Sequence, residues 1–511
     1  MVLPFTGSEY LESLRDAREV WIYGERIEDV TTHPAFATAA RMMARMYDAL
    51  HDPAVRDDLI TPLDGGGFTH RFFNPATSAE DLIKSRDAIA AWAKMSYGWM
   101  GRSPEYKASL LATLGVNADF YGDYADNARA WFQKARERVY FFNHAIINPP
   151  VDRNLSPDES SDVFLSLDRE TDGGIIVSGA KAVATGSALT HYNFIGQTSQ
   201  VTNEDLALTF IVPIHAPGVK LICRPSYPMS ALKNGTPFDY PLSSRFDEND
   251  SVLVLDQVFV PWEDVFIYRD TAKTKSFMGR SGFVPNSCFQ ACTRLAVKLD
   301  FLTGLLVKGV EATGSLDFRG VRAQIGEVLA WRNTLWALSD AMARNPEPWV
   351  NGAVLPNSRY ALAYRVMSTM AYSRYREVVQ QVVASGLIYV NSSAADFQNP
   401  ELRPDLDRYF RGSQSDAEER MKVMKLLWDA TGSEFGGRHE LYERNYLGSH
   451  EFVRLDAFFS SLGNGDLNDC VDMVEDCMDE YDLNGWTAPD LAEAHAAAQQ
   501  TLASETAQQP T

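Results

Sequence analysis

The stretch "DVFLSLDRETDGGIIVSGAKAVATGSALTHYNFIGQTS", residues 162–199, decides the fold because the hydrophobic period changes there. Apolar and polar residues alternate along it, which is typical of β-strands, and "TDGG" at residues 171–174 is a hairpin turn signal. Two further β-type stretches follow at residues 206–225 and 251–267. The sequence therefore predicts a β domain over residues 151–278.

Helical periodicity lies on both sides of this β domain. Residues 1–150 form a predicted helical domain with long helices at 78–97 and 127–146, and "NPP" at residues 148–150 is expected to end the second helix. Four long amphipathic stretches after the β domain predict an antiparallel four-helix bundle within residues 279–490. These stretches are residues 288–312, 321–343, 358–385 and 415–432. The polar, Ala- and Gln-rich residues 491–511 are expected to form a flexible tail.

Length and composition limit the class of protein. The chain has 511 residues, enough for about three domains. Its net charge of −21 argues against nucleic acid or an anionic membrane as a partner. The five cysteines, none of them in the first 222 residues, fit a reducing compartment, and they show no zinc-ligand spacing. With no signal-peptide pattern and no run of ~18 apolar residues, a cytoplasmic protein without a metal site is expected.

Two short segments carry the first candidate site residues. In "MGRSPEYKA", residues 100–108, Ser103 and Pro104 are a typical helix start, with Arg102 and Tyr106 beside it. In "FFNHAIINPPVDRN", residues 141–154, His144 is expected at an apolar helix end. Taken alone, these residues are more simply explained as an exposed arginine, a half-buried tyrosine and a core histidine. A helix start combined with arginine and tyrosine also suits a negatively charged ligand.

A third segment is polar where its neighbours are apolar. Thr185, Gly186, Ser187 and Thr190 interrupt the strands, and small hydroxyls beside a glycine let backbone N–H groups approach a flat polar heterocycle. A polar hairpin explains the same residues equally well. The chain has no strand-linked G-x-G-x-x-G, Walker or G-x-S-x-G motif. If the protein is a redox enzyme, its electrons therefore come from elsewhere.

Five motifs in a fixed order make the resemblance specific. They are "MGRSPEYKASLLATLG", "NHAIINPPVDRN", "TDGGIIVSGAKAVATGSALTH", "SSRFDENDSVLVLDQVFVPWEDVF" and "EFGGRHELYERNYLGSHE". Together they look like the oxygenase component of the 4-hydroxyphenylacetate 3-hydroxylase family, over residues 7–485. The order of helical domain, β domain and bundle also resembles the multi-domain α+β architecture of acyl-CoA dehydrogenases, whose central domain is a β-barrel.

The resemblance implies a two-component, FADH2-dependent phenol monooxygenase that acts as a homotetramer. A separate NAD(P)H:flavin reductase would supply FADH2 by diffusion, and FADH2 and O2 would form a flavin C(4a)-hydroperoxide that hydroxylates the ring ortho to the phenol oxygen. By motif, the residues that hold this oxygen are Arg102, Tyr106 and His144, and His144 is expected to accept the phenol's proton.

The same resemblance implies the flavin contacts. Those near the ring are expected at Asn148, Arg153, Thr185, Gly186, Ser187 and Thr190. Arg438 and Asn464 are expected at the FAD phosphates or adenosine, and in this architecture such late residues can come from a neighbouring subunit. The para substituent of the phenol, and whether it is free or attached to a carrier protein, cannot be read from these motifs.

Other flavoenzyme interpretations remain open at this stage. A dehalogenating or denitrating relative is one, although residues 282–295 lack the histidine thought to act as base in some dehalogenases, and Asn286 or Gln290 would line the pocket instead. A 4-hydroxybutyryl-CoA dehydratase needs cysteines near Arg102, where this chain has none. An acyl-CoA dehydrogenase would use a carboxylate base. A non-catalytic helical scaffold is a further interpretation, but it would leave buried polar side chains unpaired, which is energetically costly.

Overall fold

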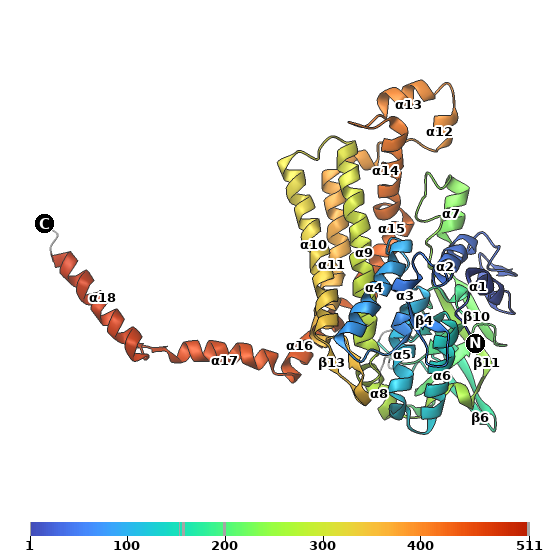
Figure 1. The fold of residues 1–511 in the computed structure, drawn as a ribbon, viewed down its shortest axis with the longest axis horizontal. Helices are drawn as coiled ribbons and strands as arrows, with labels where there is room; N and C mark the ends of the chain where they lie inside the picture. Colours follow the sequence, from blue (N-terminus) through green and yellow to red (C-terminus); the bar gives the residue numbers. More distant parts are fainter. Residues whose placement is uncertain (1, 153, 156–158, 198–200, 508–511) are drawn as a thin grey trace. The chain divides into compact units, whose positions relative to one another are not determined.

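The computed structural model describes residues 2–152, 154–155, 159–197 and 201–507, and it divides into two compact units (Figure 1). The first unit is Met1–Leu447 and the second is Gly448–Thr511. The first unit contains the expected order of helices, β-sheets and helices. The boundaries expected within it, at residues 150 and 278, stay predictions because these three parts form one unit.

Two sheets form the β domain. The larger has six strands in the order β2-β1-β10-β11-β7-β6, and the smaller has four in the order β12-β9-β8-β5. Their bounds are β1 Glu19–Ile22, β2 Glu25–Ile27, β5 Phe142–Ala145, β6 Ser166–Thr171, β7 Gly174–Lys181, β8 Tyr192–Ile195, β9 Leu208–Pro213, β10 Val219–Cys223, β11 Ser251–Pro261 and β12 Val265–Tyr268. The predicted hairpin is confirmed, because Thr171 pairs with Gly174. Three of the strands come from the first 150 residues, which were expected to be mostly helical.

The strand β5 corrects one prediction. The helix expected over residues 127–146 ends at Arg138, and Val139 takes the left-handed conformation with φ 52°. Residues 142–145 then pair in parallel with β8. Helical spacing continues past this point in the sequence, but aromatic residues favour strands, and these residues form the edge strand of the smaller sheet beside β8. His144 therefore lies on a strand of the smaller sheet.

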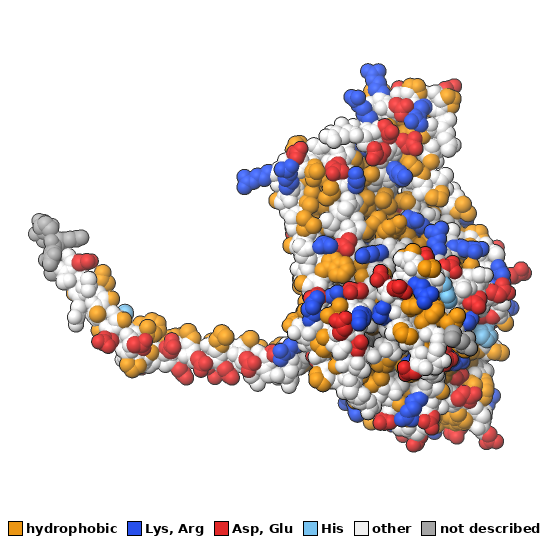
Figure 2. Space-filling model, in the orientation of Figure 1, with side chains coloured by type: hydrophobic (Ala, Val, Ile, Leu, Met, Phe, Trp, Pro, Cys, Tyr) orange, Lys and Arg blue, Asp and Glu red, His pale blue; other side chains and the backbone are white. Residues whose placement is uncertain are grey.

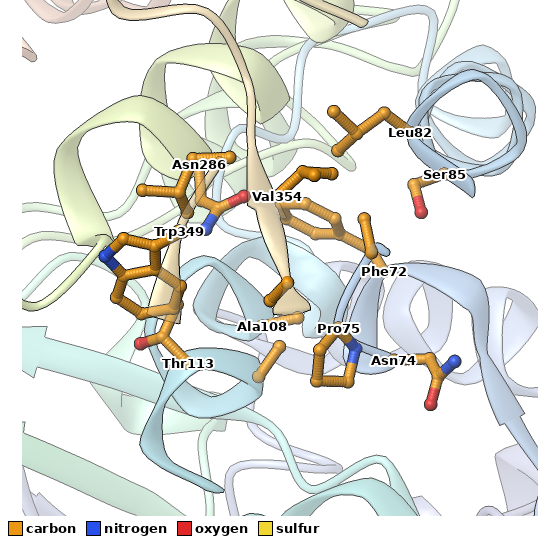
Figure 3. Close-up of a pocket in the computed structure, with 14 residues that line it drawn as sticks. Phe72, Asn74, Pro75, Leu82, Ser85, Ala108, Thr113, Asn286, Trp349 and Val354 are labelled. Carbon is orange, nitrogen blue, oxygen red and sulfur yellow. The ribbon is translucent and has the colours of Figure 1, made fainter. Parts of the chain in front are cut away.

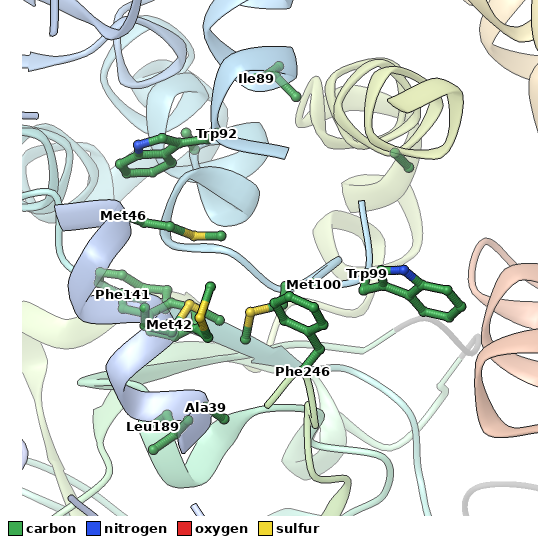
Figure 4. Packing of buried hydrophobic residues seen from close by; sticks show 14 of the residues in the cluster. Ala39, Met42, Met46, Ile89, Trp92, Trp99, Met100, Phe141, Leu189 and Phe246 are labelled. Carbon is green, nitrogen blue, oxygen red and sulfur yellow. The ribbon is translucent and has the colours of Figure 1, made fainter. Parts of the chain in front are cut away.

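The N-terminal helices pack against the β domain through a core rich in methionine and aromatic side chains. The main helices are α2 Ala37–Ala49, α4 Ala79–Met95, α5 Ala108–Val116 and α6 Ala125–Arg138. Ser78 caps α4 as expected, accepting the amide of Asp81 at 3.2 Å. Figure 4 shows Met42, Met46 and Trp92 in this core with Phe141, and all four are buried.

The expected four-helix bundle is present. Its helices are α9 Phe283–Ala312, α10 Arg319–Arg344, α11 Ser358–Val382 and α14 Ala417–Thr431, and they run side by side in Figure 1. The first of them is buried along most of its length, and Cys288 and Cys292 on it are core residues as predicted. The shorter α15, Glu434–Asn445, packs against α11 and α14. None of the described helices is long and apolar enough to cross a bilayer.

Short elements complete the first unit. The helices are α1 Gly7–Ser13, α3 Arg56–Leu59, α7 Tyr227–Asn234, α8 Thr271–Arg280, α12 Ala395–Gln398 and α13 Arg403–Tyr409. The small strand pairs are β3 Ile60–Pro62 with β4 Phe68–His70, and β13 Glu347–Pro348 with β14 Val354–Leu355.

The second unit consists of helices and one small hairpin. Its elements are α16 His450–Gly463, α17 Asp466–Asp479, β15 Tyr481–Asp482, β16 Gly485–Trp486 and α18 Pro489–Ala507. Figure 2 shows acidic and apolar side chains interleaved along it. Its large apolar side chains are exposed, among them Phe452, Phe458, Met473 and Leu483. The residues of the expected tail, up to Ala507, form α18, so its flexibility stays a prediction.

Candidate active site

The segment 100–108 differs in detail from the expected helix start. Ser103 is extended and buried and makes no side-chain cap, and Pro104 opens a 3-10 turn, Pro104–Lys107, that leads into α5 at Ala108. Gly115 lies inside α5, which continues to Val116. A Cβ there would come within 2.3 Å of the Phe132 ring, so this glycine permits close packing of α6 on α5.

Arg102 is surrounded by aromatic rings. Its guanidinium carbon lies 4.3 Å from the ring centroid of Tyr106, 4.5 Å from that of Tyr446 and 5.4 Å from that of Tyr442. Its Nη1 donates to the Tyr442 hydroxyl at 3.3 Å, and its buried Nε has no hydrogen-bond partner among the described residues. The side chain is therefore held mainly by π faces, which leaves guanidinium N–H groups for an anionic ligand.

Tyr106 and His144 are joined by a hydrogen bond. The Tyr106 hydroxyl lies 3.1 Å from His144 Nδ1, and which atom donates depends on the imidazole tautomer. Burial, with the nearby cations Lys107 and Arg102, holds the pKa of His144 well below its usual range. Burial likewise raises the pKa of Tyr106. At neutral pH the site thus has an uncharged imidazole and an un-ionised tyrosine hydroxyl.

Lys107 is a site residue that sequence reasoning missed. It is fully buried, its Nζ lies 3.8 Å from the Tyr106 ring centroid and 4.4 Å from that of Phe283, and it has no hydrogen-bond partner among the described residues. Burial and Arg102 hold its pKa well below the usual range. The available signal was its spacing, since it precedes Leu110, Leu111 and Leu114 on the apolar face of the same helical segment.

The predicted flavin loop lies next to Arg102. Gly186 has φ +76°, and a Cβ built on it would be 3.7 Å from Arg102 Cβ. The Ser187 hydroxyl accepts from Asn143 Nδ2 at 2.8 Å and donates to Asn193 Oδ1 at 3.0 Å, while Thr190 Oγ1 donates to the Ser187 carbonyl at 3.1 Å. These bonds fix the loop against the sheet that carries His144.

Several amide side-chain atoms around this loop are buried without a hydrogen-bond partner among the described residues. They are Asn143 Oδ1, Asn193 Nδ2, Gln197 Nε2 and Asn249 Oδ1. Buried polar atoms normally make a hydrogen bond, and each one left without a partner costs about 1–3 kcal/mol of folding free energy. A heterocycle with donors and acceptors on its edge, such as a flavin ring, is of the kind that fits this set.

Arg438 reaches the same region from α15. Its Nη2 lies 2.7 Å from Asp250 Oδ1 and its Nε 3.0 Å from Asp250 Oδ2, and it forms an ion pair with Glu248 at 3.6 Å. Thr185 Oγ1 donates to Asp250 Oδ1 at 2.6 Å. The structure thus links Arg438 to the flavin loop through Asp250, a residue that the motifs did not single out, and a contact of Arg438 with FAD phosphates stays a prediction.

The other predicted flavin residues are placed separately. Asn148 Oδ1 accepts from Lys181 Nζ at 2.8 Å, and Arg153 lies outside the described residues. Asn464 is exposed in the second unit, where its Oδ1 accepts the amide of Asp466 at 3.1 Å. Their roles toward flavin stay predictions.

Asn286 and Gln290, the two residues expected to line the pocket in place of a histidine, lie in different surroundings. Gln290 Nε2 donates to the buried Glu105 Oε1 at 3.0 Å. Asn286 lines the cavity of Figure 3, together with Thr113, Trp349 and Val354, and that cavity includes none of Arg102, Tyr106 and His144.

Family models match most of the chain. The model described as 4-hydroxyphenylacetate 3-hydroxylase N terminal matches residues 6–267, and the corresponding C-terminal model matches residues 274–479. The chain is 58% identical over 496 residues to the Streptomyces globisporus (3S)-3-amino-3-(3-chloro-4-hydroxyphenyl)propanoyl-[peptidyl-carrier protein SgcC2] monooxygenase, covering 96% of this chain and 94% of that protein.

Two further relatives cover the same span. The Rhodococcus sp. 4-nitrophenol 2-monooxygenase oxygenase component is 58% identical, over 96% of this chain and 95% of that protein. The Escherichia coli 4-hydroxyphenylacetate 3-monooxygenase oxygenase component is 54% identical, again over 96% of this chain and 95% of that protein.

Solved structures agree with the fold. A crystal structure of an oxygenase component of 4-hydroxyphenylacetate 3-monooxygenase, complexed with FAD and 4-hydroxyphenylacetate, matches with a TM-score of 0.85 and 30% identity, over 92% of this chain and all of that chain. A 4-hydroxybutyryl-CoA dehydratase from N. maritimus matches with a TM-score of 0.80 at 20% identity, over 91% of this chain and 94% of that chain, and shows the shared fold alone.

These matches and the fold define the class, a flavin-dependent aromatic monooxygenase with the expected acyl-CoA dehydrogenase-like architecture. More particularly, the chain belongs to the 4-hydroxyphenylacetate 3-hydroxylase family. The resemblance drawn from its five motifs is confirmed.

Proposed function

We propose that this chain is the oxygenase component of a two-component system and hydroxylates a para-substituted phenol ortho to its hydroxyl group. The observation that carries the proposal is the cluster of Arg102, Tyr106 and His144, which brings together side chains from two separate segments of the sequence. A cation, a hydroxyl donor and a neutral imidazole at one point favour negative charge on a bound oxygen atom.

Each residue of the cluster has a role in this proposal. Arg102 binds the phenol oxygen through guanidinium N–H groups and stabilises the charge that develops on it. Tyr106, whose hydroxyl stays protonated, donates a hydrogen bond to the same oxygen. His144, uncharged at neutral pH, accepts the phenol's proton. The ring carbon ortho to the oxygen becomes more electron-rich as the phenol ionises.

The flavin is proposed to bind along residues 185–190. When bound as FADH2, it supplies the electrons that activate O2. The loop, fixed by Ser187 and Thr190, presents its backbone beside Arg102. The buried amide atoms of Asn143, Asn193, Gln197 and Asn249 that have no partner among the described residues would hydrogen-bond the ring edge. Excluding water from this space protects the reactive oxygen species from loss as H2O2. Asn148, Arg438 and Asn464 are retained as proposed contacts, in the last case from a neighbouring subunit.

The proposed partners are a flavin reductase and further copies of the chain. A chain with no nucleotide-binding motif of its own needs a reductase that uses NAD(P)H. A homotetramer is supported by the exposed apolar side chains of α16 and α17, because large exposed apolar surfaces mark interaction sites.

The substrate is proposed to be a free phenol with a para substituent. The relative from Rhodococcus is named for 4-nitrophenol and that from E. coli for 4-hydroxyphenylacetate. The Streptomyces relative is named for a substrate on a peptidyl-carrier protein, which makes a carrier-bound phenol the second candidate. Release of halide is less favoured, since no histidine stands at the start of α9.

The direct experiment combines the purified chain with FAD, a flavin reductase, NADH and a panel of para-substituted phenols, free and carrier-bound. Catechol formation with the free phenols is the expected result. Catechol only from a carrier-bound phenol would support the second candidate. Formation of H2O2 alone across the panel would contradict hydroxylation.

A further inference from the structure

We propose that Lys181 is the cation that makes this chain bind reduced, anionic flavin more tightly than neutral, oxidised flavin. The inference rests on the proposed use of FADH2 and concerns a residue outside the phenol cluster. It explains how an oxygenase that receives its flavin by diffusion would select the reduced form.

Lys181 is held inside the β domain by two amides. It is the last residue of β7 and is 1% exposed. Its Nζ donates to Asn148 Oδ1 at 2.8 Å and to Gln197 Oε1 at 2.9 Å. These amides follow β5 and β8, so the lysine lies where the two sheets meet. An ammonium group has three donors, and one remains for a ligand.

No carboxylate balances the charge of this lysine among the described residues. Several other buried cations differ in this respect: Arg294 and Lys298 pair with Glu443, Lys425 pairs with Asp239, and Arg438 pairs with Asp250. Lys107 also lacks a carboxylate, but it lies over two aromatic rings. A buried ammonium without a counter-ion is costly unless an anion arrives or the proton leaves.

Burial alone lowers the pKa of Lys181 to about 7, and no charged side chain of the described residues contributes. The group can therefore gain or lose its proton near neutral pH according to its ligand. The ring of oxidised flavin is neutral, whereas that of reduced flavin loses a proton near neutral pH. A protonated Lys181 would form an ion pair with the reduced, anionic ring. Beside the neutral, oxidised ring, Lys181 would lose its proton and become a neutral amine.

The position of Lys181 agrees with this role. Residues 182–184 alone separate it from Thr185, where the predicted flavin loop begins. Its partner Asn148 is itself a predicted flavin contact. The other partner, Gln197, has a buried Nε2 without a hydrogen-bond partner among the described residues. The site thus offers an ammonium and an amide donor side by side.

The test compares dissociation constants of oxidised FAD and of FADH2, measured anaerobically without phenol, for the wild type, Lys181→Met and Lys181→Arg. We expect Lys181→Met to weaken FADH2 binding at least tenfold more than FAD binding. A tenfold change in this ratio lowers the midpoint potential of the bound flavin by about 30 mV. Lys181→Arg keeps the charge and should keep most of the preference. Lys220→Met, on an exposed residue of β10, is the matched control.

Equal weakening of both redox forms by Lys181→Met would overturn the proposal, because a lysine that only joined the sheets or held the diphosphate would affect FAD and FADH2 alike. If Lys181→Met does not fold, the proposal is tested instead by measuring proton uptake when the wild type binds each redox form of the flavin. At pH 8, binding of FADH2 should take up close to one proton and binding of FAD close to none, and equal uptake would contradict the role. Catechol formation by the wild type is read separately, so failure here leaves the proposed hydroxylation intact.

Discussion

The Tyr106 hydroxyl lies 3.1 Å from Nδ1 of His144, although 38 residues separate the two in the chain. The contact joins a 3-10 turn before α5 to strand β5, and Arg102 lies over the same tyrosine ring. The helix start and the strand therefore meet at one point, where a phenol oxygen is proposed to bind.

Replacement of Arg102 by lysine tests its role in phenol binding. Lysine keeps the charge but loses the planar group that lies among three tyrosine rings. A hydrogen bond to a charged group contributes about 1.5–3 kcal/mol, so phenol affinity should fall roughly 10- to 100-fold. This change in affinity is measured by equilibrium binding of 4-nitrophenol to the wild type and the variant. The exposed Arg129→Lys is the control, and equal affinity in both variants would refute the role.

Replacement of Lys107 by methionine should stabilise the protein. The amine is buried with no hydrogen-bond partner among the described residues, and methionine has a similar length without the polar group. We expect the free energy of unfolding in urea to rise by about 1–3 kcal/mol. The pKa of His144 should also rise, because a cation that lowers it is removed, and NMR titration of the imidazole measures this.

A loss of stability in Lys107→Met with an unchanged His144 pKa would contradict that prediction. The matched control is Lys273→Met, which removes a partly exposed lysine paired with Asp270 and should change stability by less than about 0.5 kcal/mol.

Replacement of Arg438 by methionine should destabilise the first unit. Asp250 and Glu248 would lose a buried cation, and breaking such a pair costs about 3–5 kcal/mol. Arg403→Met removes an exposed pair with Asp407 and should cost at most about 1 kcal/mol. Urea denaturation compares them. An equally small loss of unfolding free energy in both variants would contradict this prediction. It would mean that Arg224, which also contacts Asp250, balances the charge of that carboxylate without Arg438.

Stability should fall on mild acidification. Burial lowers the pKa values of His70 and His191 to about 3, so both stay neutral in the folded chain while the unfolded chain binds protons below about pH 6.5. The unfolded state then binds more protons, and stability decreases by about 1.4 kcal/mol per pH unit for each histidine. Unfolding in urea from pH 7.5 to 5 measures this slope, and His70→Gln should reduce it by one proton. A flat profile would show that these histidines are charged when folded.

Local patterns were enough to predict much of this structure. The period change at residue 162, the cap at Ser78 and the four long helices are local signals, and all three are present. The pairing of β1 with β10 is not local, since its partners are about 200 residues apart. Val139 ends α6 through a left-handed backbone that its side chain does not favour, so no sequence pattern announced β5.

The grouping of the candidate site residues could also be predicted, whereas their roles stay predictions. Motif resemblance placed Arg102, Tyr106 and His144 together, and the structure brings them into contact. For Lys107, the apolar spacing of its helical segment was a usable signal of burial. The surroundings of Lys181 were not predictable, because a lysine in a strand is normally solvated and its burial depends on residues distant in sequence. The role of Asp250 in joining Thr185 to Arg438 was not predicted either, because its two partners are distant from it in the sequence.

The most direct test of the account is the ionisation of a bound phenol. 4-Nitrophenol changes absorbance when it ionises, so its pKa on the protein can be titrated without flavin or turnover. The account predicts a pKa below that of free 4-nitrophenol on the wild type, and a return toward the free value in Arg102→Met and His144→Ala but not in the control Arg129→Met. A bound phenol that titrates like free phenol in all four proteins would contradict an anion site formed by Arg102, Tyr106 and His144.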